Sequence, residues 1–127
     1  MKLEHVAFQV SDPVAMGTWY VEHLGFTIRR SGEGPAFGRF LADGSGCVML
    51  ELYRNPAAPV PDYRSIDPIL LHVAFVCDDL PATVDRLVVA GAERLSGPSQ
   101  SGGDQFAMLR DPWGLAIQLV RRAEPML

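Results

Sequence analysis

The sequence His-Val-Ala-Phe occurs twice in this chain, first at His5–Phe8 and again at His72–Phe75, 67 positions later. Each copy lies in an apolar run of the kind that forms a β-strand. A lone histidine in such a run is usually a core residue whose ring is hydrogen-bonded. Its repetition in the same context indicates a duplicated structural unit, so the fold must contain two copies of one motif.

The first half of the chain has the pattern β-α-β-β-β. Alternating apolar residues predict a strand over residues 2–10, after which Asp12 and Pro13 begin a helix that Gly25 ends. Turns rich in glycine then separate three further predicted strands, at residues 26–30, 37–41 and 47–53.

The second half repeats this pattern after residues 55–68, which hold four of the ten prolines and break both periodicities. Asp79 is expected to cap the second helix, and residues 96–103 are expected to form a loop after a short strand at 93–95. We predict one α+β domain over residues 1–127, built from two tandem βαβββ modules with curved mixed sheets and helices on their outer faces. Its parts are module 1 (1–54), a linker (55–68) and module 2 (69–122).

Composition narrows the classes of partner and location. A net charge of −4 and a pI near 5.2 argue against a nucleic-acid partner. No apolar run approaches the length of a membrane span, and no leader pattern is present, so we expect a cytoplasmic protein without a membrane partner. Cys47 and Cys77 are expected to be small buried residues, with a disulfide between them left open. The chain after Arg121 and Arg122 is expected to be frayed.

Two pairs of polar residues share one spacing. His5 and Glu51 are 46 positions apart, and so are His72 and Gln118. Each pair joins the first strand of a module to its last, on the face opposite the apolar residues. A carboxylate in a central strand is costly unless it is paired or bound to a metal. We therefore predict that the four side chains bind one divalent ion.

This donor set suits Zn, Ni, Mn, Co or Fe(II) and would be unusual for Ca. With Gln118 in place of a second carboxylate, the ion would keep about one unit of positive charge, which favours an anionic, enediolate-like oxygen. Alternatives remain open: core histidines bonded to backbone, Glu51 paired with an arginine such as Arg39, and Gln118 as a pocket-lining residue. Met49 and Tyr53 share the face of Glu51, where they would line a substrate pocket or simply pack.

The chain resembles the vicinal oxygen chelate superfamily, also called the glyoxalase/bleomycin-resistance/extradiol-dioxygenase group. The resemblance rests on both His-Val-Ala-Phe segments and on three further segments, Leu24-Gly25-Phe26, Met49-Leu50-Glu51-Leu52 and Asp111-Pro112-Trp113-Gly114 with the strand to Gln118. It implies the same four metal ligands, with Glu51 also acting as the catalytic proton-transfer group. Asn55 matches a position near glutathione in glyoxalase I, whereas Gln9 and Pro68 stand where that enzyme tends to carry arginines. Gln9 and Asn55 are therefore candidate substrate contacts.

These expectations favour a metal-dependent lyase or isomerase of the glyoxalase type, acting on a small substrate with vicinal oxygens through an enediolate-type intermediate. An Fe(II) dioxygenase is the second reading, although ring-cleaving relatives are usually longer. A metal-free binding protein of the bleomycin-resistance kind is the third. The resemblance also implies a homodimer, in which each site would draw His5 and Glu51 from one subunit and His72 and Gln118 from its partner.

Overall fold

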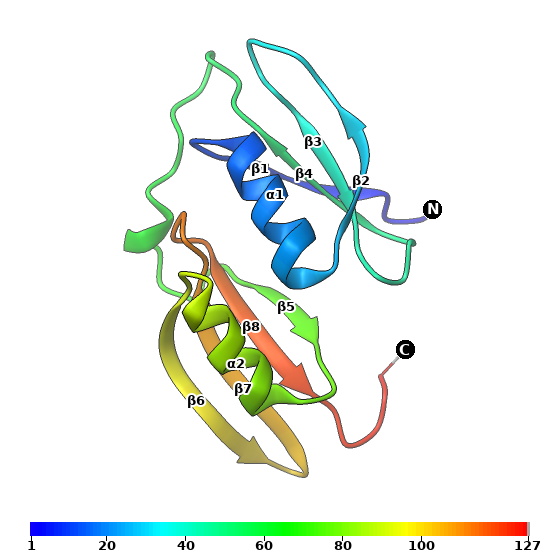
Figure 1. Cartoon of the computed structure of the whole chain (residues 1–127), viewed down its shortest axis with the longest axis vertical. Coiled ribbons are helices and arrows are strands. Elements are labelled where there is room, and N and C mark those ends of the chain that lie inside the picture. The colour runs from blue at the N-terminus through cyan, green and yellow to red at the C-terminus, as the bar shows by residue number, and fades with distance from the viewer. Residues whose placement is uncertain (127) are drawn as a thin grey trace. The chain divides into compact units, whose positions relative to one another are not determined.

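The computed structural model describes residues 1–126 and divides into two compact units, one comprising residues 1–61 and the other beginning at Asp62. The boundary falls inside the segment 55–68 that the prolines mark as a linker. Each unit is described by itself below, and Figure 1 labels the helices and strands of both.

The first unit forms a four-stranded sheet covered by one helix. Its elements are β1 (His5–Gln9), α1 (Pro13–Leu24), β2 (Thr27–Ser31), β3 (Arg39–Ala42) and β4 (Met49–Tyr53). The strand order is β1-β4-β3-β2, with β1 parallel to β4 and the other neighbours antiparallel. Helix α1 crosses one face of this sheet, as Figure 1 shows. The opposite face is therefore available for polar side chains.

Local signals fix both ends of α1. Asp12 precedes the helix, and its Oδ1 accepts the backbone N–H of Ala15 at 2.9 Å. Gly25 ends the helix with a φ of 73°, a left-handed conformation that glycine adopts without strain, and its N–H is bonded to the Tyr20 carbonyl. Both ends are as the sequence predicts.

The second unit repeats this topology. A short 3₁₀ helix, η1 (Tyr63–Ser65), precedes β5 (Val73–Val76), α2 (Leu80–Val89), β6 (Glu93–Ser101), β7 (Asp104–Arg110) and β8 (Ala116–Arg121). The strand order is β5-β8-β7-β6, again with the first strand parallel to the last. Asp79 caps α2 through the N–H of Ala82. The predicted class, an α+β fold of two βαβββ modules, is confirmed.

Strand β6 differs from the prediction, because it continues through residues that were expected to form a loop. Gly97 has a φ of 81°, and a Cβ at this position would lie 2.5 Å from the carbonyl oxygen of Phe106. Only glycine permits this close approach. The pairing of β6 with β7 shifts on both sides of Ser96, so the segment is an irregular edge strand.

The core follows the predicted alternation in β4 and β8, where Leu50, Leu52, Ile117 and Leu119 are buried. The expectation for Cys47 is wrong: it is exposed and precedes β4. The reason is the turn before it, in which the Asp43 carboxylate accepts the N–H groups of Ser45 and Gly46 and delays the start of β4 to Met49. Cys77 is only partly buried, and both cysteines are free thiols.

The segment after β8 is held in place rather than frayed. Arg122 forms an ion pair with Asp104, with 2.6 Å between Nη1 and Oδ2, and the N–H of Ala123 donates to the same carboxylate at 2.8 Å. The hydrogen bond from Ala123 has the larger effect and that from Arg122 the smaller, and together they hold the pKa of Asp104 below its ordinary value. Ordered structure therefore extends at least to Ala123.

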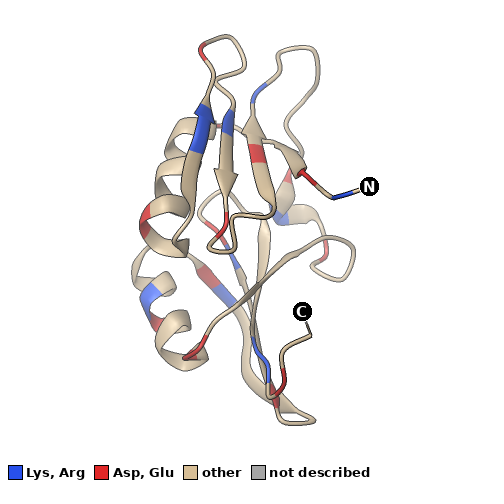
Figure 2. Cartoon of the chain, turned by 90° about the vertical axis from the view of Figure 1, so that its right-hand side faces the viewer, with Lys and Arg blue, Asp and Glu red and all other residues tan. Residues whose placement is uncertain are grey.

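Charged residues are spread over both units. Figure 2 shows acidic and basic positions interspersed along helices, strands and loops. No helix in residues 1–126 has the length and apolar character needed to cross a membrane.

Candidate metal-binding pairs

His5 and Glu51 meet on the open face of the first sheet. His5 lies on β1 and Glu51 on β4, where Ala7 is the register partner of Glu51. His5 Nε2 is 3.5 Å from Glu51 Oε2, and their side chains are 34% and 24% exposed. Two donor atoms bound to one zinc ion with tetrahedral geometry are about 3.3 Å apart. The pair therefore fits the spacing of two ligands of a shared divalent ion.

The ring of His5 is oriented by two neighbours. Its Nδ1 lies 2.8 Å from Glu4 Oε2, and its ring meets the Phe40 ring edge to face at 5.6 Å between centroids. A carboxylate only accepts, so Glu4 favours the tautomer of the neutral ring with the proton on Nδ1. In that tautomer Nε2, on the side of Glu51, would be the nitrogen available to a metal ion. A carboxylate behind a histidine is also the usual support of a metal-binding imidazole.

His72 has an equivalent arrangement in the second unit. Its Nδ1 lies 2.7 Å from the carbonyl oxygen of Pro68. A carbonyl also only accepts, so this contact favours the tautomer of the neutral ring that is protonated at Nδ1 and has its lone pair on Nε2. The turn around Pro68 is fixed by Asp67, whose carbonyl accepts the N–H of Leu70 and whose carboxylate accepts that of Ile69.

Neither histidine is a core residue, because His5 is half-buried and His72 is exposed. The alternative in which both are satisfied core histidines is therefore wrong.

Gln118 occupies in the second sheet the place of Glu51 in the first. Gln118 on β8 lies opposite Ala74, as Glu51 on β4 lies opposite Ala7. Convergence of the two pairs on one ion stays a prediction. Among residues 1–126, no group of three or more His, Cys, Asp or Glu side chains is arranged to hold a metal ion.

Arg39 does not neutralise Glu51. Its Nη1 donates to the carbonyl oxygens of Gly32, Phe37 and Gly38, at 2.9–3.1 Å, so it holds the loop between β2 and β3. The alternative of an Arg39–Glu51 pair is therefore wrong, and in the described part of the chain the recorded ion-pair partner of Glu51 is His5.

The predicted substrate contacts have different surroundings. Gln9 is 8% exposed; its side-chain N–H groups donate to the carbonyls of Asn55 and Ala58, and its Oε1 accepts the N–H of Asn55. Gln9 therefore anchors the loop after β4. Asn55 lines a cavity of about 490 Å³ in the first unit, while Met49 and Tyr53 are half-buried on the face of Glu51. Contact of these four residues with a substrate stays a prediction.

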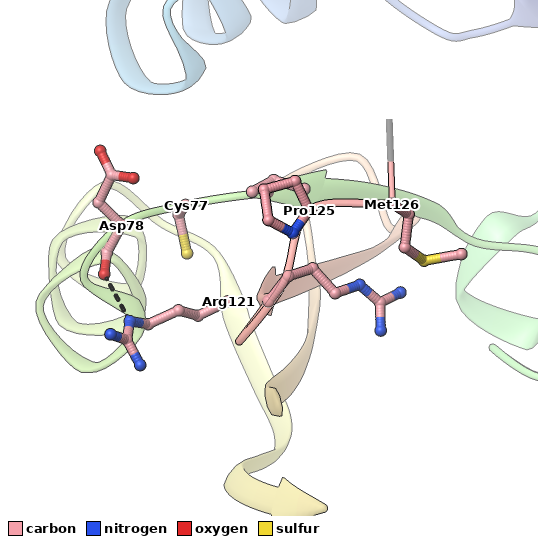
Figure 3. Close-up of a pocket in the computed structure, with 7 residues that line it drawn as sticks. Cys77, Asp78, Arg121, Pro125 and Met126 are labelled. Carbon is pink, nitrogen blue, oxygen red and sulfur yellow. Dashed lines mark hydrogen bonds between the residues drawn. The ribbon is translucent and has the colours of Figure 1, made fainter. Parts of the chain in front are cut away.

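A larger cavity, of about 810 Å³, lies in the second unit beyond the ends of β5 and β8 and is not predicted by the sequence. Figure 3 shows side chains around it, contributed by Val76, Cys77, Asp78, Arg121, Arg122, Pro125 and Met126. Arg121 Nε donates to the Asp78 carbonyl at 3.1 Å. Burial raises the pKa of the Cys77 thiol, which disfavours a reactive thiolate. Neither His72 nor Gln118 lines this cavity, so it is separate from the predicted ligands.

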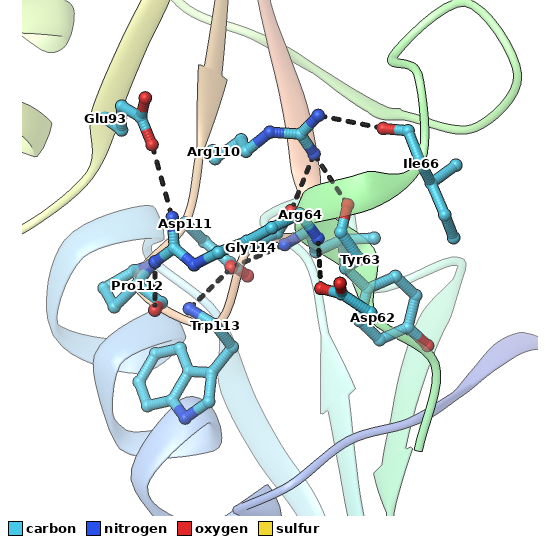
Figure 4. A network of polar contacts seen from close by, with 11 residues as sticks. Asp62, Tyr63, Arg64, Ile66, Glu93, Arg110, Asp111, Pro112, Trp113 and Gly114 are labelled. Atoms are coloured by element: carbon cyan, nitrogen blue, oxygen red, sulfur yellow. Dashed lines mark hydrogen bonds and ion pairs between the residues drawn. The ribbon is translucent and has the colours of Figure 1, made fainter. Parts of the chain in front are cut away.

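Buried Arg110 is a supporting residue that sequence reasoning missed. It is 8% exposed, and its guanidinium donates to the carbonyls of Tyr63, Ile66 and Gly114 at 2.8–2.9 Å (Figure 4). The neighbouring Asp111 accepts backbone N–H groups within the same turn. Together they fasten η1 to the β7–β8 turn and so fix the start of the segment that carries Pro68 and His72.

Comparison with known proteins identifies related sequences and folds. Residues 2–119 match the sequence profile of the Glyoxalase/Bleomycin resistance protein/Dioxygenase superfamily. A protein of Vibrio parahaemolyticus named "Probable lactoylglutathione lyase" is 27% identical over 130 aligned positions, covering 97% of this chain and 92% of that protein.

Solved structures show the same fold. The antibiotic binding protein TnmS3 of Streptomyces sp. CB03234 has a TM-score of 0.74 at 24% identity, with 97% of each chain covered. A glyoxalase/bleomycin resistance protein/dioxygenase family enzyme of Burkholderia phytofirmans has a TM-score of 0.78 at 20% identity, covering 95% of this chain and 98% of that one.

Proposed function

Because the chain belongs to the Glyoxalase/Bleomycin resistance protein/Dioxygenase superfamily, we propose that it is a metal-dependent lyase or isomerase of the glyoxalase type. Its substrate would be a small molecule with two vicinal oxygens. The observation that carries this proposal is the His5–Glu51 pair, with 3.5 Å between Nε2 and Oε2 on an open sheet face. The contact of His72 Nδ1 with the Pro68 carbonyl supports it as well, because it orients the ring of a second proposed ligand.

His5, Glu51, His72 and Gln118 would hold the ion, which we propose to be Zn, Ni, Mn, Co or Fe(II). When bound, a divalent ion polarises vicinal oxygens and so lowers the pKa of the adjacent C–H group. The Nδ1 contacts of His5 and His72 orient both rings before any ion arrives. The carboxamide of Gln118 contributes an oxygen without adding negative charge.

Glu51 would move the proton. The amide of Gln118 cannot act as a base, so Glu51 is the one carboxylate in the proposed ligand set, and it would take the proton from one carbon and return it to the next. The half-buried side chains of Phe40, Met49 and Tyr53 lie on the same face of the sheet and would give the substrate apolar surface beside Glu51. Asn55, which lines the cavity after β4, would contact the substrate beyond the reacting carbons.

The test is the metal content of protein purified without added metal, compared with Glu51→Gln. Wild type is expected to carry or to take up one divalent ion per site and to isomerise vicinal-oxygen substrates, whereas Glu51→Gln is expected to lose both properties. The matched control is Glu22→Gln, which changes an exposed carboxylate of α1. A wild type that takes up none of the five metals would overturn the proposal. Oxygen uptake by the protein seen only with Fe(II) would show that its function is that of a dioxygenase instead.

A metal-free small-molecule binder is the second candidate. The observation in its favour is that the described residues contain no clustered group of three potential metal-binding side chains. TnmS3, which shares the fold, is described as an antibiotic binding protein. This candidate predicts ligand binding by wild type without metal, with an affinity that Glu51→Gln leaves unchanged.

We further propose a cytoplasmic homodimer with sites shared between subunits. Mixing Glu51→Gln protein with His72→Asn protein tests the sharing, because a heterodimer would then regain one intact site from the unchanged halves of the two chains. If each site belongs to a single chain, mixing the two variants restores neither metal binding nor activity. An acidic net charge of −4 supports a protein without a nucleic-acid partner.

A further inference from the structure

We propose that Arg30 forms an anion subsite beside His5 and Glu51 and that it binds a carboxylate at the distal end of the substrate. The inference rests on the proposed function for the position of the reacting carbons. The subsite predicts that the substrate carries a distal carboxylate, a feature that the vicinal-oxygen chemistry alone does not specify.

The register of the first sheet places Arg30 and Glu51 in one row. Arg30 on β2 lies opposite Phe40 on β3, and Phe40 lies opposite Glu51 on β4. Residues that are directly opposite one another in a sheet share a face, so all three side chains lie on the face that carries His5. The backbones of Arg30 and Glu51 are two strand spacings apart, about 10 Å. A small substrate is long enough to reach from one side chain to the other.

An irregularity in β2 aims Arg30 at this row. The pairing of β2 with β3 shifts between Ile28 and Arg30, so Arg29 has no register partner and Arg30 takes the place opposite Phe40. Without the shift Arg29 would stand there. Bulges of this kind re-aim side chains and are common beside active sites. The guanidinium of Arg30 lies 5.8 Å from the centre of the Phe40 ring, and the same ring also meets the ring of His5.

The guanidinium of Arg30 lacks a carboxylate partner among the described residues. The second unit shows what such a partner looks like: Arg122 lies 5.6 Å from the centre of the Phe106 ring, and its Nη1 is 2.6 Å from Asp104. Arg30 likewise lies beside an aromatic ring, but the described residues give it no such acid. Arginine binds carboxylates through two parallel hydrogen bonds, so a substrate carboxylate would supply the missing group.

Two 2-oxo acids that differ only at the distal end provide the test. Both 2-oxoglutarate and 2-oxopentanoate carry vicinal oxygens, but only 2-oxoglutarate has a second carboxylate. Binding to Zn-loaded protein is measured by calorimetry and by the ¹⁵N NMR signals of the arginine Nε groups. Wild type is expected to bind 2-oxoglutarate about tenfold more tightly, with the Arg30 signal shifting. Arg30→Met is expected to remove this preference, and Arg30→Lys to retain part of it.

Arg29→Met is the matched control, because it removes an equal charge from an adjacent exposed position. It is expected to keep the tenfold preference. Equal affinity of wild type for the two acids, or a preference that survives Arg30→Met or disappears equally in Arg29→Met, would overturn the subsite.

Failure of the proposed function gives a different result. In that case zinc does not bind, while titration of the metal-free protein with glutarate and with glutaramide still tests Arg30. If glutarate but not glutaramide shifts the Arg30 Nε signal, the subsite is supported without the proposed function. If neither compound shifts it selectively, the subsite is overturned.

Discussion

The carbonyl oxygen of Pro68 lies 2.7 Å from Nδ1 of His72, and this contact engages Nδ1 rather than Nε2 of the ring. The arrangement is local, because the two residues are four positions apart in one turn. It therefore orients a candidate ligand without any contribution from the first unit.

Neutral His72 is expected to adopt the tautomer protonated at Nδ1, since the Pro68 carbonyl can only accept a hydrogen bond. Two-bond ¹H–¹⁵N correlation spectra distinguish the tautomers, and added zinc should shift the Nε2 resonance. The same ring in urea-unfolded protein is the control, because the turn is then absent. A folded protein with His72 protonated at Nε2 would contradict the assignment.

Replacing Arg110 is expected to be among the most destabilising single changes in the second unit. Arg110→Met removes the guanidinium hydrogen bonds to the carbonyls of Tyr63, Ile66 and Gly114, two of which are buried, and should lower the free energy of unfolding by about 2 to 4 kcal/mol. Urea denaturation at neutral pH measures the change.

Arg64→Met is the control for this prediction. Arg64 bonds Glu93 and the Pro112 carbonyl from an exposed position, so its loss should cost about 1 kcal/mol or less. Equal losses in the two variants would show that burial does not strengthen the Arg110 contacts.

The fold was predictable from the sequence because the signals that specify it are local. The repeated His-Val-Ala-Phe, the capping residues Asp12 and Asp79 and the stop at Gly25 each act within a few positions. Alternation along β4 and β8 also assigned Leu50 and Ile117 to the core and Glu51 and Gln118 to the other face. The equal spacing of the two polar pairs then follows from a repeated register.

Features that depend on contacts between distant segments were not predictable. The composition of residues 96–103 alone indicates a loop. The segment pairs as a strand because Gly97, which has no Cβ, lets the backbone at Phe106 come close. The burial of Arg110 depends on η1 folding back onto the β7–β8 turn. The position of Arg30 depends on a one-residue shift in the pairing of β2, which no periodicity reveals. In each case the partner lies beyond the few positions over which the local signals act.

Asp104 is expected to make the stability of the second unit depend on pH. Its pKa is lowered in the folded chain, so its contribution to stability is complete above the unfolded-state pKa and is lost as the pH falls through the lower folded-state value. Asp104→Asn should therefore be less stable than wild type at neutral pH, and the difference should shrink in acid. Urea denaturation along a pH series measures this, with Glu124→Gln as the control. A difference that is independent of pH would contradict it.

The two cysteines are expected to differ in reactivity. Cys47 is exposed in the turn before β4, whereas Cys77 is partly buried and burial raises its pKa, so less of it is thiolate near neutral pH. In Cys77→Ser protein the remaining Cys47 should react quickly with a disulfide reagent, and in Cys47→Ser protein the remaining Cys77 should react slowly. Raising the pH should narrow the gap, and unfolding in urea should abolish it. Equal rates in the folded variants at neutral pH would show that the cavity beside Cys77 admits the reagent freely.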